Sequence, residues 1–129
     1  MENLRDTICA LSTPPGHSGI AVVRLSGERS FELAGKVFVP YGHEGPAPPR
    51  TARLGRILDS LGAEIDEALV LRFPAPNSYT GEEMVEFSTH GSPVIAAALL
   101  DALCSRGARL SGPGEFTLRA FVNGKMNLA

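Results

Sequence analysis

Many short β-rich runs alternate with only a few helical segments along this chain, which leaves few fold classes open. Helical spacing of apolar residues is clear over about Glu28–Val37 and Pro93–Ser105, and a short last helix is expected over Glu115–Val122. The expected strands are Thr7–Leu11, Ile20–Leu25, Arg53–Leu58, Ala68–Phe73 and Met84–Ser88, with a short final strand at Arg109–Leu110. Helices are too few for a repeated βαβ pattern, so we predict an α+β fold with a mixed or antiparallel sheet of about five strands and about three helices.

Residues that favour turns and caps mark the ends of these elements. Ser26 is expected to cap the first helix, while Pro93 suits the first turn of the second helix, which Gly107 ends. The stretch Pro40–Arg50 holds four of the ten prolines and is interpreted as a surface loop of low functional weight. The stretch around Gly62 predicts the turn of a hairpin.

Composition excludes several classes of protein. With 43% hydrophobic and 20% charged residues, the chain has the make-up of one globular domain with its own core. No apolar run approaches the roughly 20 residues of a membrane-spanning helix, and Met1–Asp6 is no secretion signal, so we expect a cytoplasmic protein. A net charge of -2 does not provide the broad basic face of an autonomous nucleic-acid binder. Cys9 and Cys104 have no metal-ligand spacing, so we expect reduced, mostly buried thiols.

Five segments carry most of the functional information. They are Pro14–Gly19, Ser78–Glu86, His90–Gly91, Pro113–Thr117 and Arg119–Lys125. In this order and spacing they resemble, over nearly the whole chain, the N-terminal domain of the MnmE (TrmE) family of tRNA-modifying GTPases. Each segment alone is a weak signal, whereas five in register are highly specific.

The resemblance implies a fold similar to the folate-binding domain of the glycine-cleavage aminomethyltransferase. It also implies a reduced folate, 5-formyltetrahydrofolate or 5,10-methylenetetrahydrofolate, as one-carbon donor, and a homodimer formed through this domain. Family members continue with a helical domain interrupted by a GTPase domain, and act with the flavoprotein MnmG on the wobble uridine of certain tRNAs, giving 5-carboxymethylaminomethyl or related modifications. We therefore expect residues 1–122 to be the folate-binding and dimerisation domain and residues 123–129 to begin the helical domain of a longer protein.

The sequence gives no sign of a nucleotide-binding loop. It contains no G-x-x-x-x-G-K-[ST] segment, and Gly124-Lys125 alone does not qualify. In the family that the chain resembles, GTP, Mg²⁺ and K⁺ belong to the GTPase domain. We expect this chain neither to bind nor to hydrolyse GTP, and to be inactive as an enzyme by itself.

Glu86 is the leading candidate for a folate contact. It lies between Val85 and Phe87 in an apolar strand, and a pterin ring offers an amino group and an adjacent N–H that one carboxylate accepts in bidentate fashion. From the residues alone, a solvated strand position is the commoner interpretation, but the folate-contacting glutamate of the family matches Glu86. Glu82, directly after Gly81, is expected to be a solvated loop acid.

Arg24 and Lys125 match two basic folate-contacting positions of the family, although the residues alone allow both to be solvated charges. Folate carries carboxylates on its glutamate tail and polar acceptors on its ring, so the sequence leaves open which end each cation meets. His90 is interpreted as a polar turn residue, because no second His or Asp stands at ligand spacing. No catalytic residue and no metal ligand is predicted.

Two other functions stay open. A self-contained folate-dependent one-carbon transferase would need a nucleophile or a proton-transfer pair, and the sequence shows no such constellation at useful spacing. A pure interaction domain with a vestigial pocket is the other alternative. Folate binding and turnover by the purified chain distinguish the three functions.

Overall fold

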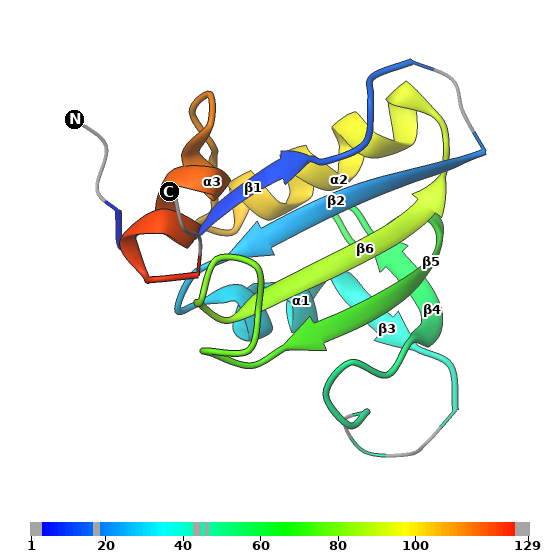
Figure 1. The fold of residues 1–129 in the computed structure, drawn as a ribbon. Coiled ribbons are helices and arrows are strands. Elements are labelled where there is room, and N and C mark those ends of the chain that lie inside the picture. The colour runs from blue at the N-terminus through cyan, green and yellow to red at the C-terminus, as the bar shows by residue number, and fades with distance from the viewer. Residues whose placement is uncertain (1–3, 17–18, 43–44, 46, 126–129) are drawn as a thin grey trace.

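Seven strands of the described residues form one mixed sheet, in the order β3-β4-β5-β6-β2-β1-β7 (Figure 1). The structure is a computed structural model that describes residues 4–16, 19–42, 45 and 47–125. Strands β1 and β7 pair in parallel, and all other neighbouring strands are antiparallel. The elements in chain order are β1 (Ile8–Leu11), β2 (Ile20–Ser26), α1 (Ser30–Val37), β3 (Phe38–Pro40), β4 (Arg53–Leu58), β5 (Glu64–Phe73), β6 (Met84–His90), α2 (Pro93–Ser105), β7 (Arg109–Leu110) and α3 (Glu115–Val122).

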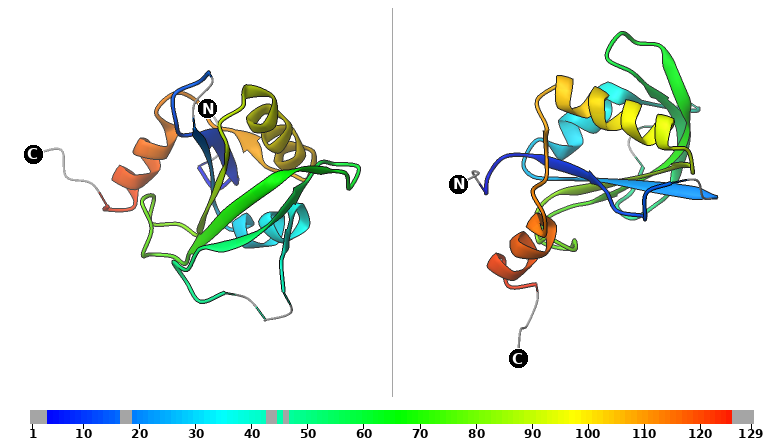
Figure 2. Two further views of the ribbon diagram at one scale, coloured as in Figure 1. Left: turned by 90° about the vertical axis from the view of Figure 1, so that its right-hand side faces the viewer. Right: turned by 90° about the horizontal axis from the view of Figure 1, so that it is seen from above.

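Helices α1 and α2 cover one face of the sheet, and α3 lies at one end of it (Figures 1 and 2). Each of the two covering helices presents an apolar stripe, because residues three and four apart share a face. The Ser92 hydroxyl accepts a hydrogen bond from the Ile95 N–H at 3.4 Å, which caps α2 directly before Pro93. The side chains that fill the core from the helices are Leu33, Ala34, Val37, Leu99, Ala102 and Leu103.

Alternation along β2 and β6 separates the two faces of the sheet. Val23, Leu25 and Phe87 are fully buried in the core beneath the helices. Because successive side chains of a strand point to opposite faces, Arg24 and Glu86 lie on the face away from α1 and α2. The fold therefore places two of the predicted site residues on the same open face.

The predicted α+β class with a mixed sheet and three helices is confirmed, but the described residues form seven strands instead of about five. Strand β3 was not predicted, because it continues directly from α1 and ends at Pro40, the start of the predicted loop. Strand β5 begins at Glu64, whereas the sequence predicted its start at Ala68. The first four residues of the strand were missed because they are mostly polar and carry no clear strand pattern.

Ser26 does not cap α1, which begins only at Ser30. The chain turns at Gly27, whose φ of 134° is a conformation that favours glycine. The Ser26 hydroxyl oxygen instead lies 2.7 Å from the Thr80 hydroxyl oxygen and donates to a Glu82 carboxylate oxygen at 2.7 Å. Ser26 therefore joins the end of β2 to the loop that precedes β6.

Some of the predictions concern parts of the chain outside the described residues. These parts are His17 and Ser18 of the Pro14–Gly19 segment, and residues 126–129 at the expected start of a helical domain. Within the described part of the chain, no helix is both long and apolar enough to cross a membrane.

Candidate functional site

Arg24 and Glu86 form an ion pair across the neighbouring strands β2 and β6. They are register partners, and Arg24 Nε donates to Glu86 Oε2 at 2.8 Å. Their side chains keep 35% and 25% of their exposure, so both can be reached from solvent. The structure supplies the strand register that the sequence left open and brings two predicted site residues into contact.

Tyr79 connects this ion pair with Lys125, the third predicted site residue. The Arg24 Cζ atom lies 5.7 Å from the centroid of the Tyr79 ring, within the range of a cation–π contact. Tyr79 and Lys125 both line a hollow of about 320 Å³, which is completed by Arg50, Phe73, Asn77 and Ser78. Lys125 therefore belongs to the same region as the ion pair, although among the described residues it bonds to neither member.

A close approach between the end of α3 and the loop before β6 positions Lys125. Asn123 Nδ2 donates to the Thr80 carbonyl at 2.9 Å, and the Lys125 N–H donates to the Ala120 carbonyl at 2.8 Å. A Cβ atom on Gly81 would lie 2.9 Å from Asn123 Cβ and 3.2 Å from Lys125 Cγ, and its φ is +80°. Glycine suits both this backbone conformation and this spacing, so Gly81 allows the two segments to pack.

Arg119 joins α3 to the same loop from inside the protein. Its side chain is 1% exposed, and its Nη1 atom donates to both carboxylate oxygens of Glu82, at 3.1 and 3.3 Å. Its Nη2 atom donates to Glu115 Oε2 at 3.2 Å. The expectation that Glu82 is a solvated acid is therefore wrong, because its carboxylate holds α3 against the loop and is only 20% exposed.

Glu115 lies between two arginines and extends this network to β7. Arg109 donates to the two Glu115 carboxylate oxygens at 2.9 and 2.8 Å, and the Gly112 N–H donates to one of them at 2.8 Å. The hydrogen bonds from Arg109 outweigh the opposing effect of burial and lower the pKa of Glu115 from 4.5 to about 2. Arg109 Nε also donates to Asp6 at 3.1 Å, so the network reaches the segment before β1.

We expect Glu115 to make the fold sensitive to acid. Its folded pKa lies below its unfolded value, so its contribution to stability is complete above about pH 4.5 and is lost as the pH falls towards about 2. At about 1.4 kcal/mol per pKa unit, the full loss is up to about 3 kcal/mol. Urea denaturation of the parent and of Glu115→Gln across this range should show a shallower pH dependence for the variant, and equal slopes would contradict the assignment. Glu83→Gln, whose carboxylate makes no hydrogen bond or ion pair within the described residues, should keep the parent's slope.

His90 has an acidic partner that the sequence did not reveal. His90 Nδ1 lies 2.9 Å from Asp66 Oδ2, and the His90 N–H donates to the same carboxylate at 3.1 Å. Burial raises the pKa of Asp66, but hydrogen bonds from the backbone N–H groups and from the His90 ring outweigh it and leave the pKa lowered. His90 is four residues from Glu86 along β6, or roughly 13 Å, so this pair lies outside the candidate site.

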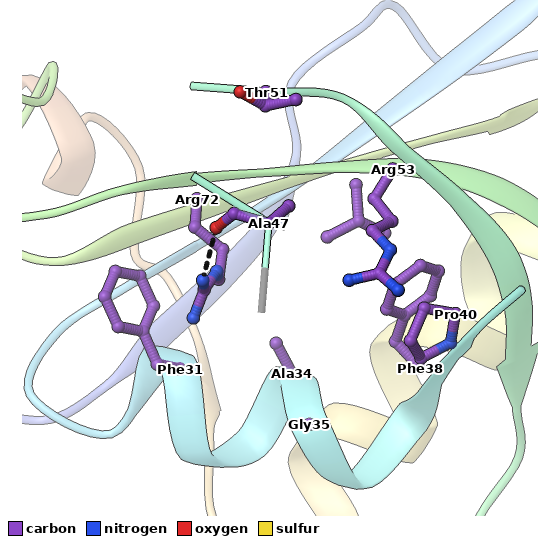
Figure 3. Close-up of a pocket in the computed structure, with 10 residues that line it drawn as sticks. Phe31, Ala34, Gly35, Phe38, Pro40, Ala47, Thr51, Arg53 and Arg72 are labelled. Carbon is purple, nitrogen blue, oxygen red and sulfur yellow. Dashed lines mark hydrogen bonds between the residues drawn. The ribbon is translucent and has the colours of Figure 1, made fainter. Parts of the chain in front are cut away.

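A second hollow, of about 250 Å³, lies on the helix side of the sheet (Figure 3). Phe31 of α1 lines it together with Arg72 of β5, and the Arg72 Cζ atom lies 5.2 Å from the centroid of the Phe31 ring. Arg72 also donates to the Ala47 carbonyl at 2.7 Å. Among the described residues that line this hollow there is none of the predicted site residues, so it is separate from the site on the open face.

The open-face site offers groups that are suited to binding. The Glu86 carboxylate accepts hydrogen bonds, and the Arg24 guanidinium donates them. Tyr79 offers an exposed aromatic ring, and Lys125 offers a second positive charge. This combination fits a ligand that has hydrogen-bond donors at one end, a flat ring and a negative charge.

Comparisons with known proteins give one consistent result. A family model described as "GTP-binding protein TrmE N-terminus" matches residues 7–125. The tRNA modification GTPase MnmE of Halorhodospira halophila is 53% identical over 124 residues, covering 95% of this chain and 25% of the relative. A protein of the same description from Thermus thermophilus is 49% identical over 132 residues, covering 98% of this chain and 29% of the relative. The chain therefore spans between a quarter and a third of the length of these relatives.

Proposed function

The chain belongs to the MnmE (TrmE) family of tRNA modification GTPases, and on this premise we propose that it is a folate-binding, homodimerising N-terminal domain. The ligand that we propose is 5-formyltetrahydrofolate or 5,10-methylenetetrahydrofolate, the one-carbon donor for a wobble-uridine modification carried out with the flavoprotein MnmG. The observation that carries the proposal is the accessible Arg24–Glu86 pair beside Tyr79 and Lys125.

The pterin end of a folate fits the Glu86 carboxylate. A carboxylate offers about four lone-pair directions on its two oxygens, and Arg24 uses one of them on Oε2. Enough acceptor capacity is left for the amino group and the adjacent ring N–H of a pterin. Arg24 holds the carboxylate in place and supplies a donor of its own for the polar acceptors of the ring.

The chemistry of the modification is assigned in this proposal to a longer protein. The sequence contains no phosphate-binding loop. A self-contained one-carbon transferase is the alternative, and it requires turnover by this chain alone.

Folate is expected to raise the melting temperature of the purified chain, and GTP is expected to leave it unchanged. A ligand that binds only the folded state at about 100 times its Kd adds about 2.7 kcal/mol to the free energy of unfolding. Thermal denaturation with 5-formyltetrahydrofolate, and separately with GTP, measures both effects. A shift with GTP or none with the folate would contradict the proposal, and consumption of 5,10-methylenetetrahydrofolate by the chain alone would favour the transferase.

The open face also offers an apolar surface that supports a homodimer. Leu54 and Leu69 are register partners on β4 and β5, and both are 43% exposed. Ile20 is 60% exposed and lines the same hollow of about 210 Å³ as the two leucines. Contiguous exposed apolar residues of this kind are typical of interaction surfaces, and a second copy of the chain is the partner that we propose.

Leu69→Glu is expected to convert the dimer to a monomer, because it places a carboxylate within the proposed apolar interface. Sedimentation at tens of micromolar should give a dimer for the parent and a monomer for the variant. Leu61→Glu introduces the same charge at a position that is 92% exposed in the turn after β4, and it should stay dimeric. A parent that sediments only as a monomer, or a dimeric Leu69→Glu, would contradict the proposal.

A further inference from the structure

Two cations, Arg50 and Lys125, line the open-face hollow of about 320 Å³, and Glu86 is not among the described residues that line it. Lys125 follows α3, and Arg50 lies three residues before β4, so they come from parts of the chain that are far apart in sequence. Both are exposed, and within the described residues neither is paired with a carboxylate. Arg24 and Arg109, by contrast, are each held by an acid. Arg50 and Lys125 therefore keep their positive charge available to a ligand in the hollow.

The backbone and side chain of Arg50 are fixed by the protein. Arg50 has a φ of 61°, a left-handed conformation that is uncommon for a residue other than glycine. Its N–H donates to the Arg72 carbonyl at 2.9 Å, and its Nη2 atom donates to the Asn77 carbonyl at 2.8 Å. Within the described residues, one of the five N–H donors of the guanidinium is engaged in this way, so the others can donate to the oxygens of a carboxylate.

The order of the groups across the site matches the order of the parts of a folate. Glu86 and Arg24 form the end that accepts pterin donors, and Tyr79 contacts Arg24. Tyr79 also lines the hollow together with the two cations Arg50 and Lys125. A folate likewise runs from its pterin through an aminobenzoyl ring to a glutamate. Each further γ-linked glutamate adds one carboxylate to that tail.

We propose that Arg50 and Lys125 bind the carboxylates of the glutamate tail, so that the site prefers polyglutamylated reduced folates to the monoglutamate. This inference rests on the proposed folate binding and assigns Lys125 to the tail end and Arg24 to the pterin end. Because both cations are exposed, their contribution is modest and screened by salt. We expect roughly tenfold tighter binding of the pentaglutamate at low salt, and a smaller preference at high salt.

Titration calorimetry with 5-formyltetrahydrofolate as monoglutamate and as pentaglutamate tests the inference. The variant is Arg50→Asn, because asparagine adopts the left-handed conformation more readily than most residues and the change removes the charge without adding strain. We expect it to remain folded in thermal denaturation and to reduce the preference for the pentaglutamate to about twofold or less. Lys36→Gln removes an exposed charge on α1, on the other face of the sheet, and should keep the tenfold preference.

The outcomes separate this inference from the proposed function. If the parent binds both folates with equal affinity, the tail assignment is overturned while folate binding stands. If Arg50→Asn weakens both folates equally and leaves their ratio unchanged, Arg50 does not contact the tail and the inference fails. If the parent binds neither folate, the proposed function itself fails and the tail assignment with it.

Discussion

Replacement of Arg119 by leucine is expected to lower the free energy of unfolding by roughly 3 to 5 kcal/mol. The guanidinium is 1% exposed and lies between the carboxylates of Glu82 and Glu115, which are 20% and 7% exposed. Removing it leaves the largely buried Glu82 carboxylate without its cation, and Glu115 then keeps Arg109 as its cation. The Glu82 charge must be protonated or rehydrated. Urea denaturation at pH 7 measures the loss.

Two further variants test whether the loss comes from the ion pairs. Lys36→Leu removes a cation whose partner, Glu32, is half exposed on α1, and its stability should stay close to that of the parent. Glu82→Gln added to Arg119→Leu should recover part of the lost stability, because the unpaired charge of Glu82 is then gone. A stability of Arg119→Leu equal to that of the parent, or no coupling between positions 82 and 119, would contradict this account.

Because of the same network, a substitution of Glu82 is not a suitable control in an experiment that tests which residue binds the folate. Its carboxylate holds Arg119 of α3 and accepts from Ser26 at the end of β2. Loss of either bond would loosen α3, and Lys125 follows this helix directly. A substitution of Glu82 would therefore weaken folate binding by moving Lys125, without any contact between Glu82 and the ligand.

The sequence was most informative where structure depends on near neighbours. Helix α2 was predicted with its observed ends, because its apolar stripe, Pro93 and Gly107 are all local signals. The family was likewise predicted correctly from five short segments, and the match of residues 7–125 confirms it. Strand β3 was missed, since three residues between a helix and a proline-rich loop carry no periodicity that a sequence could show.

Contacts between distant residues account for what the sequence did not reveal. Arg119 in an eight-residue helix looks like a solvated charge, and its partner Glu82 is 37 residues away in the chain. The Cys9 and Cys104 sulfur atoms lie 3.8 Å apart although 95 residues separate them.

For Glu86, the sequence predicted the candidate residue but not its contacts. Its apolar neighbours and its match to a family glutamate marked it as a candidate, but its face and its partner depend on the pairing of β6 with β2. Arg24 is 62 residues away in the chain and lies directly opposite. The pairing of the two strands places Arg24 where it can hold the Glu86 carboxylate on an accessible face of the sheet. A carboxylate that anchors a polar ring has to be both fixed and accessible.

Glu86→Gln is expected to lower the affinity for 5-formyltetrahydrofolate by about ten- to a hundredfold, which corresponds to a loss of roughly 1 to 3 kcal/mol in the free energy of binding. The variant keeps the shape of the side chain, and its amide oxygen can still accept from Arg24. Its amide nitrogen, however, brings a donor towards the donor pair of the pterin, so one ring donor is left without an acceptor. Titration calorimetry measures the affinity, and sedimentation and thermal denaturation should show that the dimer and the fold are retained.

Glu83→Gln is the matched control for this experiment. Glu83 is half-buried just before β6, and its carboxylate has no hydrogen bond or ion pair within the described residues, so its removal should leave the folate affinity unchanged. A folded Glu86→Gln that binds the folate as tightly as the parent would show that Glu86 does not anchor the pterin. Loss of affinity in Glu83→Gln instead would place the anchor at Glu83, directly before β6, and would contradict its assignment to Glu86.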